Sequence, residues 1–465
     1  MKLPAELKHI LFETPELRRA YLVGGCVRDG LLGRPQKDFD IEVYGLPYEA
    51  LQRCLTRWGR PDLVGRSFGV VKLSTSSGAT YDFSVPRRDS KTMPGHKGFE
   101  IQLDPEIEPE QAAARRDFTI NALMLDVRSE KILDFFGGEK DLRNKTLRHV
   151  GDAFPEDPLR VLRGMQFAGR FDLTAAPETL ALCRSIVGTF KELAPERIRE
   201  EWFKWARLSA APSAGLRFLR DGGWIEHFPE LAALIGVRQD PGWHPEGDVW
   251  NHSLHACDAM AGLETWKQAD EESRIAWMLA ALCHDLGKAH TTSEEMKKGR
   301  LRIVSHGHAE RGVALAEAFL QRIDAPLMYR QRVAPLVADH LVQIAPLSDR
   351  GIRRLAARLA PETILGLIQL ITADHSARPP LPPGLPTTAR QLLERSGDLQ
   401  IAQQAPRALL MGRHLLEKGM TPGPQMGIIL KAAYEAQLDG LFDDLDGAMA
   451  WLDGVGKMYI RAGGK

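Results

Sequence analysis

The fold is decided by Tyr21-Leu-Val-Gly-Gly-Cys-Val-Arg-Asp29 and, after a short turn, Lys37-Asp-Phe-Asp-Ile-Glu-Val-Tyr44. Side chains alternate along a strand, so Asp38 and Asp40 are expected to point to the same face. Two carboxylates on one face suit hard divalent cations, which prefer oxygen ligands. The pair Gly24-Gly25 lets the backbone approach a ligand closely, and its N–H groups suit phosphate oxygens. Metal ions that face a triphosphate are typical of nucleotidyl and phosphoryl transferases.

Length and composition set the broad class of the protein. A chain of 465 residues is expected to hold about three domains. Lys and Arg together number 61, as do Asp and Glu, so the chain is formally neutral and a nucleic acid would need a local basic surface. Five scattered cysteines without a Cys-x-x-Cys pair indicate buried thiols in a reducing compartment. No segment resembles a signal peptide or a membrane span, so we expect a cytoplasmic protein without a membrane partner.

Three later segments offer further polar residues for the first site. Asp82, on a predicted strand, is either a third metal carboxylate or a polar residue of an edge strand. Arg116 and Asp117 stand side by side and can hold a phosphate and a ribose hydroxyl together. Asp157 and Arg160 lie three residues apart at a predicted helix start, so they share a face. A local ion pair is the alternative for those two residues.

The combination and order of these motifs resemble the class II nucleotidyltransferases of the polymerase β superfamily. That family comprises the tRNA CCA-adding enzymes and bacterial poly(A) polymerases. The resemblance implies that Asp38 and Asp40 are catalytic and bind Mg²⁺, and that the partners are tRNA, CTP and ATP. It also implies a nucleotide-binding set, to which Asn121 and Arg163 belong. In this set Gly24, Gly25 and Arg28 would position the triphosphate, Arg116 and Asp117 would fix the ribose, and Asp157 and Arg160 would choose the base.

The resemblance leaves several activities open. The chain could add the whole CCA sequence, only CC or only A, because these enzymes share every motif above. A poly(A) polymerase is disfavoured by the neutral charge and the second site described next. A head that only binds RNA is disfavoured by the intact pair Asp38 and Asp40. Residues 86–114 are expected to form a long flexible loop, and the charges of residues 195–205 are given a structural role.

A second group of polar residues begins near residue 240. An adjacent His284-Asp285 inside an apolar helix needs partners when buried, and a metal ion is one. With His252 and Asp374 this pair has the order and spacing of the HD superfamily of metal-dependent phosphohydrolases. His308 and His340 fall where binuclear members of that superfamily place extra ligands.

Imidazole and carboxylate ligands suit transition metals such as Ni²⁺, Mn²⁺ or Co²⁺ more than Mg²⁺. The resemblance implies hydrolysis of a phosphoester, such as a 2′,3′-cyclic phosphate on damaged tRNA. The alternative is a relict site in a domain that only holds tRNA.

The expected fold is an α/β head with a small mixed antiparallel sheet of the polymerase β type, followed by all-α neck, body, HD and tail domains. β-type alternation stops near Asp141, where helical periodicity takes over. We therefore expect a head over 1–138, a helical neck and body over 139–235, an HD domain over 236–378 and a tRNA-contacting tail over 387–465. The Pro-rich stretch 378–386 is expected to be a stiff linker. The protein is expected to be a monomer or a homodimer.

Overall fold

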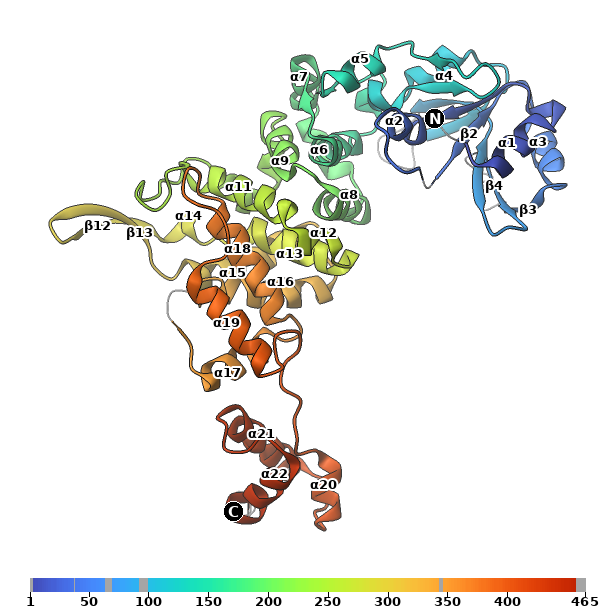
Figure 1. Ribbon diagram of the computed structural model, residues 1–465. Coiled ribbons are helices and arrows are strands. Elements are labelled where there is room, and N and C mark those ends of the chain that lie inside the picture. Colours follow the sequence, from blue (N-terminus) through green and yellow to red (C-terminus); the bar gives the residue numbers. More distant parts are fainter. Residues whose placement is uncertain (1–2, 37, 63–68, 92–98, 343–345, 457–465) are drawn as a thin grey trace. The chain divides into compact units, whose positions relative to one another are not determined.

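The computed structural model describes residues 3–36, 38–62, 69–91, 99–342 and 346–456. Its internal contacts divide the chain into two compact units, Met1–His227 and Phe228–Lys465, here called the N-terminal and the C-terminal unit. Figure 1 shows the N-terminal unit as a sheet with helices and the C-terminal unit as almost wholly helical. The expected succession of a mixed-sheet head and helical domains is confirmed.

The head is built on a seven-stranded sheet in the order β3-β4-β5-β2-β1-β8-β9. Neighbouring strands run antiparallel except β2 and β5, which are parallel. In chain order the strands are β1 (Ala20–Val23), β2 (Asp40–Val43), β3 (Gly59–Asp62), β4 (Val70–Thr75), β5 (Thr80–Ser84), β8 (Met124–Asp126) and β9 (Ile132–Leu133). This parallel pair sets the first residue of β2, Asp40, beside Asp82 in the middle of β5.

Apolar alternation along the strands explains why this sheet forms. Leu22, Ile41, Val71 and Phe83 are fully buried and belong to one core cluster. Side chains at every second position leave the sheet on the same side, so each strand gives one face to this core. The helices α1 (Ala5–Phe12) and α3 (Tyr48–Leu55) contribute further residues to the cluster.

The expectation of a long loop over 86–114 is wrong for the described residues. Strands β6 (Arg87–Lys91) and β7 (Phe99–Leu103) pair antiparallel, and the helix α4 (Pro109–Ala114) follows. Apolar residues alternate along β7 in the sequence, but the surrounding polar, Gly-rich and Pro-rich composition hid this weak signal. Residues 92–98, the centre of the expected loop, lie outside the described residues.

The rest of the N-terminal unit is mostly helical. Its long helix α6 packs against α8 and α9, and Pro158 caps the N-terminus of α6 as a fixed first-turn residue. Two short strands of this unit, β10 (Thr146–Leu147) and β11 (Thr174–Ala175), form a parallel pair. The helices are α2 (Gly25–Leu31), α5 (Gly138–Arg143), α6 (Leu159–Phe171), α7 (Pro177–Ser185), α8 (Pro195–Leu208) and α9 (Pro212–Asp221).

The C-terminal unit is a helical assembly that carries one antiparallel hairpin, β12 (Thr292–Lys297) and β13 (Arg300–Ser305). Helix α11 packs on α13 and α18, and α16 packs on α13 and α15. The helices are α10 (Pro229–Ala232), α11 (Val249–Gly262), α12 (Glu264–Gln268), α13 (Glu271–Cys283), α14 (Lys288–Thr291), α15 (His308–Arg322), α16 (Leu327–Asp339), α17 (Asp349–Leu359), α18 (Ile364–Ser376), α19 (Thr387–Asp398), α20 (Gly412–Glu417), α21 (Pro424–Leu438) and α22 (Leu445–Trp451).

The last helices form a separate small core. Leu415, Ile429 and Phe442 belong to one apolar cluster over α20 to α22. Helix α19, in contrast, packs against α17 and α18. The four domain boundaries expected from the sequence stay predictions. Within the described ranges no single helix is long and apolar enough to cross a membrane. The helices α17 and α18 meet the length and composition criteria only when taken together, and the chain bends sharply between them.

Candidate functional sites

A cavity of about 540 Å³ in the N-terminal unit gathers most residues expected at the first site. Nine basic and four acidic side chains among the described residues line it. Because the whole chain is formally neutral, this concentration creates a local positive potential suited to polyphosphate or RNA. The expected residues that line it are Gly24, Gly25, Arg28, Asp40, Arg116, Asp117, Asn121, Asp157, Arg160 and Arg163.

Three carboxylates lie near one another where β2 begins beside the middle of β5. Asp40 lies opposite Asp82 in the parallel register, and Asp38 lies two positions before the start of β2. Although part of Asp40 is open to solvent, desolvation raises the pKa of its carboxyl; Arg116 opposes this, and the Asp82 and Asp38 carboxylates raise the pKa further. A divalent cation would relieve the repulsion among these carboxylates, so the donor set fits Mg²⁺.

Gly24 allows a close approach between backbone and side chain at the cavity wall. Its φ is +71°, a conformation that favours glycine, and a Cβ there would lie 2.8 Å from Arg116 Nη1. Its N–H donates to the Leu123 carbonyl at 3.1 Å, which ties the turn to the strand β8 region. A larger residue at this position would therefore displace the Arg116 guanidinium from the cavity.

Arg28 is more enclosed than a simple phosphate-binding residue would be. Its side chain is 4% exposed and its guanidinium lies 4.3 Å from the centre of the Phe171 ring. It donates to Asp29 at 2.9 Å and to Asn121 Oδ1 at 2.5 Å. These contacts hold Arg28 in a fixed orientation at the cavity wall.

The buried carboxylate of Asp117 organises the neighbouring polar groups. Its Oδ2 accepts from Arg163 Nε at 2.7 Å, and its Oδ1 accepts from Asn121 Nδ2 at 3.0 Å. Burial alone would raise the pKa of Asp117, but Arg163 and these hydrogen bonds outweigh it and lower the pKa. Asp117 is therefore ionised, with α6 linked to the head through Arg163.

Asp157 and Arg160 both line the cavity, and both have protein partners. Arg160 donates from Nη1 to the Ala153 carbonyl and from Nη2 to the Arg115 carbonyl, each at 2.7 Å. Asp157 Oδ2 accepts from Arg197 Nη2 at 2.9 Å. A guanidinium has five N–H donors, so Arg160 keeps donors for a ligand while its plane is fixed.

Sequence reasoning missed a second contributor to this cavity. Arg197, Glu201 and Lys204 of α8 also line it, although residues 195–205 were assigned a structural role. Their spacing of three and four residues places them on one face of the helix. That spacing was visible in the sequence, but a charged helical face is usually solvated, so it did not indicate a cavity.

The C-terminal unit brings together all six predicted metal ligands. They come from α11, α15, α18 and the ends of α13 and α16, and their side chains are His252, His284, Asp285, His308, His340 and Asp374. Two groups have ligand atoms within 4.8 Å of one another, the first with His252, His284 and Asp374 and the second with Asp285, His308 and His340.

The four histidines all turn the same nitrogen toward the centre. The Nδ1 atoms of His284, His308 and His340 face the backbone carbonyls of Ala281, Ser305 and Val337 at 2.7–2.8 Å. A carbonyl only accepts, so each Nδ1 carries the proton and each Nε2 carries the lone pair of the neutral ring. Such partners fix the tautomer of metal-ligating histidines.

The Nε2 atoms of the histidines meet in two pairs. His252 and His284 approach at 3.3 Å, and His308 and His340 at 3.2 Å. Burial, followed by the nearby His284, lowers the pKa of His340 to about 4, so His340 is neutral. Between His308 and His340, two facing lone pairs at this distance repel, whereas a transition metal about 2.1 Å from each nitrogen joins them. His252 differs, because burial would lower its pKa but hydrogen bonds to Asp374 and Glu246 outweigh it and raise the pKa to about 9. The donor set therefore fits one or two such ions.

Asp285 lies between the two groups. Its Oδ2 is 3.3 Å from His284 Nε2, and its Oδ1 is 3.3 Å from His308 Nε2. One carboxylate thus offers one oxygen to each group. Lys288 Nζ lies 2.7 Å from Asp285 Oδ2 and donates to Gln239 at 2.8 Å. Gly287 lies between Asp285 and Lys288 in the sequence. A larger residue does not fit there, because its Cβ would collide with the His308 carbonyl.

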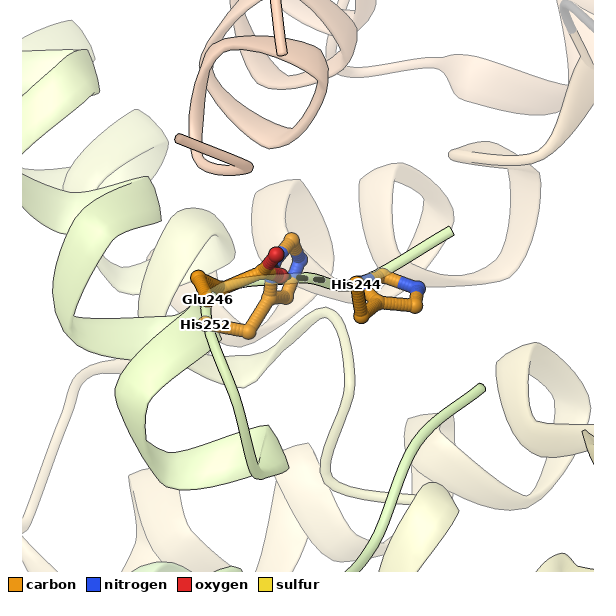
Figure 2. Close-up of side chains that lie close together, drawn as sticks. All are labelled: His244, Glu246 and His252. Carbon is orange, nitrogen blue, oxygen red and sulfur yellow. Dashed lines mark hydrogen bonds and ion pairs between the residues drawn. The ribbon is translucent and has the colours of Figure 1, made fainter. Parts of the chain in front are cut away.

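Two residues behind the first group were not predicted. Figure 2 shows Glu246 between His244 and His252, with hydrogen bonds to both. Glu246 Oε1 accepts from His244 Nδ1 at 2.8 Å and from His252 Nδ1 at 2.7 Å. Burial would raise the pKa of Glu246, but these two hydrogen bonds outweigh it and lower the pKa to about 2. The segment is a loop without periodicity, so only the pairing of His with Glu could have indicated it.

A head with paired carboxylates in a basic cavity, followed by a buried His–Asp cluster, defines a nucleotidyltransferase that carries an HD domain. Residues 20–148 match the poly A polymerase head domain family, and residues 249–375 match the HD domain family. A multifunctional CCA protein of Xanthomonas campestris pv. campestris (strain B100) is 38% identical over 374 residues, which cover 77% of this chain and 85% of that protein. The chain therefore belongs to the multifunctional CCA protein family.

Solved structures support the fold. A Bacillus stearothermophilus CCA-adding enzyme in complex with CTP matches with a TM-score of 0.62 at 21% identity, covering 99% of this chain and 100% of that one. A Thermotoga maritima CCA-adding enzyme complexed with tRNA matches with a TM-score of 0.55 at 20% identity, covering 93% of this chain and 91% of that one. The fold expected from the sequence is thereby confirmed.

Proposed function

We propose that this protein adds CCA to the 3′ end of tRNA from CTP and ATP, and that its HD site hydrolyses a phosphoester. The observation that carries the first part is that one basic cavity holds Gly24, Asp40, Asp117 and Arg160 together. The family membership supports the same activity, because its members are multifunctional CCA proteins. CTP and tRNA are bound in solved CCA-adding enzymes of the same fold.

In this proposal the head residues divide the work at the triphosphate. Mg²⁺ held by Asp38 and Asp40 would lower the pKa of the tRNA 3′-hydroxyl and stabilise the leaving pyrophosphate. Asp82 is proposed as a third carboxylate because it neighbours Asp40 in register. Gly24, Gly25 and Arg116 would hold the phosphates, since backbone N–H groups and a guanidinium together suit their oxygens.

Base choice would depend on Asp157, Arg160 and Arg197. Arg160 offers donors and Asp157 offers acceptors, and the contacts to Arg197 and to two carbonyls hold both side chains in place. A rigid polar edge rejects bases that leave its buried groups unpaired. Arg163, Asn121 and Asp117 form a hydrogen-bonded set in the same cavity and would bind the ribose.

For the HD site we propose hydrolysis of a 2′,3′-cyclic phosphate. A transition metal such as Mn²⁺, Ni²⁺ or Co²⁺ would supply an activated water. As the water oxygen bonds to phosphorus, one ring P–O bond breaks, and the freed ribose oxygen takes up the proton that the water loses and becomes a hydroxyl. A cavity beside the metal ligands, here called the HD cavity, is lined by Lys288 and His244 among others. These two side chains would contact the phosphate oxygens.

The test of nucleotide addition uses tRNA transcripts that end at the discriminator base, at C or at CC. CTP and ATP are supplied with Mg²⁺, singly and together. We expect full CCA on the shortest transcript when both nucleotides are present. Arrest at CC, or addition of A only to the CC-ended transcript, would replace the proposal with a split-specificity enzyme, and long A tails on unrelated RNA would replace it with a poly(A) polymerase.

A further inference from the structure

The hairpin of β12 and β13 has one strongly basic face. In the antiparallel register Lys297 pairs with Arg300 and Glu295 pairs with Arg302. Cross-strand partners lie on the same face of a ribbon, so these four charged side chains share one side. Lys298 stands at the turn between the strands. The face therefore carries more positive than negative charge.

Two of these cations are available to a ligand. Lys297 lies 3.4 Å from Glu295, and Arg302 lies 3.1 Å from Asp240. Lys298 and Arg300 are exposed, and across the described ranges no carboxylate lies within 4.0 Å of either side chain. Exposed lysine and arginine side chains without carboxylate partners suit the phosphates of a nucleic acid.

An exposed tryptophan lies beside this basic face. Trp243 is 65% exposed, which is unusual for the largest side chain. The backbone N–H of Trp243 donates to the Asp240 carbonyl at 3.0 Å, and the Asp240 carboxylate is bound by Arg302 of the hairpin. The ion pair thus fixes the turn that carries Trp243 against β13.

The basic face leads directly to the metal ligands. A cleft of about 780 Å³ is lined by Trp243, Lys297, Lys298, Arg300 and Arg302, among others. The HD cavity, of about 560 Å³, shares Asp240, Trp243 and Ile303 with this cleft. The two spaces therefore meet at Trp243, next to His244 of the HD cavity.

We propose that the HD site acts on the 3′ end of a single-stranded RNA, whose bases stack on Trp243 and whose phosphates contact Lys298 and Arg300. Non-specific single-strand binding combines a basic groove with an aromatic side chain. The cleft extends the space beyond the HD cavity, and its basic lining is complementary in charge to a polynucleotide. This inference names the substrate class of the HD site and rests on the phosphoester hydrolysis proposed above.

The test compares two substrates that carry the same scissile group. One is an oligonucleotide of about six nucleotides with a 3′-terminal 2′,3′-cyclic phosphate, and the other is the nucleoside 2′,3′-cyclic monophosphate. With the full-length protein and Mn²⁺ we expect kcat/KM for the oligonucleotide to exceed that for the mononucleotide about tenfold or more. Equal kcat/KM values for the two substrates would overturn the inference.

Variants of the cleft should change the longer substrate more than the shorter one. Arg300→Glu is expected to lower kcat/KM for the oligonucleotide about tenfold, mainly through KM, and to leave the mononucleotide unchanged. Trp243→Ala, which also alters the wall of the HD cavity, should lower kcat/KM for the oligonucleotide more than for the mononucleotide. Trp243→Phe, which keeps an aromatic ring, should restore most of the loss. Arg390→Glu makes the same charge change at an exposed position outside both cavities and should have no effect. Equal losses on both substrates would overturn the inference.

Two further outcomes are decisive. If neither substrate is hydrolysed, the hydrolysis proposal fails, and fluorescence anisotropy then tests binding of the oligonucleotide on its own. Unchanged affinity in Arg300→Glu would overturn the inference in that case. Exposed Met296 and Leu301 also lie on the hairpin. The alternative to RNA binding is therefore that the hairpin forms a contact between two copies of the chain. A change in sedimentation of Trp243→Ala or Arg300→Glu would favour that use and overturn the RNA surface.

Discussion

The two centres of this protein differ in how their polar side chains are held. In the HD cluster the four histidines donate from Nδ1 to fixed acceptors, and their Nε2 atoms converge. In the head, Asp38 and Asp40 are exposed, and Asp82 lies 3.5 Å from the mobile ammonium group of Lys72. Asp157 and Arg160, which we propose select the base, line the basic cavity and are fixed by Arg197 and two carbonyls.

This difference teaches that each site fixes the side chains that must select a ligand, the metal in one site and the base in the other. The HD cluster must define a metal geometry, so the protein supplies the orienting contacts around every histidine. The head must accept a different nucleotide and primer end at each step, so its carboxylates stay open while the groups that face the base are fixed. The predictions below test that contrast, beginning with the largest expected effect.

Loss of an open carboxylate in the head should remove nucleotide addition. Asp40→Asn is expected to reduce addition of CTP to a tRNA transcript by about a thousand-fold or more, because charge at the reacting phosphate is no longer stabilised. Asp82→Asn should also reduce it if that carboxylate completes the site. Glu110→Gln, an exposed change on α4 outside the cavity, is the matched control, and single-nucleotide extension is the measurement.

Metal binding should stabilise the C-terminal unit. A ligand at a hundred times its Kd stabilises the folded state by about 2.7 kcal/mol, which corresponds to about 5–10 °C in Tm for a unit of this size. We expect Mn²⁺ or Ni²⁺ to produce such a shift in calorimetry of the full chain, and EDTA to reverse it. Asp285→Asn should lose the shift, and an unchanged shift in that variant would contradict its position between the two groups.

Glu246 should act through the metal ligand that it orients. Glu246→Ala is expected to weaken Mn²⁺ or Ni²⁺ affinity about 10- to 100-fold, because His252 loses the acceptor that fixes its tautomer. Glu246→Gln keeps an acceptor oxygen and should recover part of that affinity. Calorimetric titration with the metal measures this directly, and Glu310→Gln on the exposed side of α15 is the control. Equal affinity in Glu246→Ala and the unmodified protein would remove Glu246 from the site.

Arg197 should affect nucleotide choice more than rate. Arg197→Ala releases Asp157 and is expected to reduce the preference for CTP over UTP about tenfold. Arg160→Ala should relax the choice further, since it removes the donors themselves. Competition between labelled nucleotides on one transcript measures the ratio, with Arg220→Ala, outside the cavity, as control. Unaltered selectivity in Arg160→Ala would contradict the base-selecting role.

Much of the architecture could be predicted from the sequence because its signals are local. Alternation around Asp40 marked β2, and the adjacent His284-Asp285 in an apolar helix indicated a buried polar cluster. The parallel register that sets Asp82 beside Asp40 depends on a crossover, so Asp82 remained open between two interpretations. The hairpin of β6 and β7 was missed because polar composition outweighed a short alternation.

Contacts between distant segments could not be predicted in the same way. The bond between Arg197 and Asp157 joins residues 40 positions apart, and the role of Glu246 depends on a loop folding back onto α11. Charged residues on a helical face or in a loop are usually solvated, so their sequence alone gives no reason to expect burial. Tertiary packing, which local patterns do not encode, decides both cases.

The most direct test of the account measures both activities in the same three preparations. The unmodified protein, Asp40→Ala and Asp285→Ala are each assayed for CCA addition to a tRNA transcript and for hydrolysis of a terminal 2′,3′-cyclic phosphate. We predict that Asp40→Ala loses addition and keeps hydrolysis, and that Asp285→Ala shows the reverse. Loss of both activities in either folded variant would contradict two independent centres in one chain.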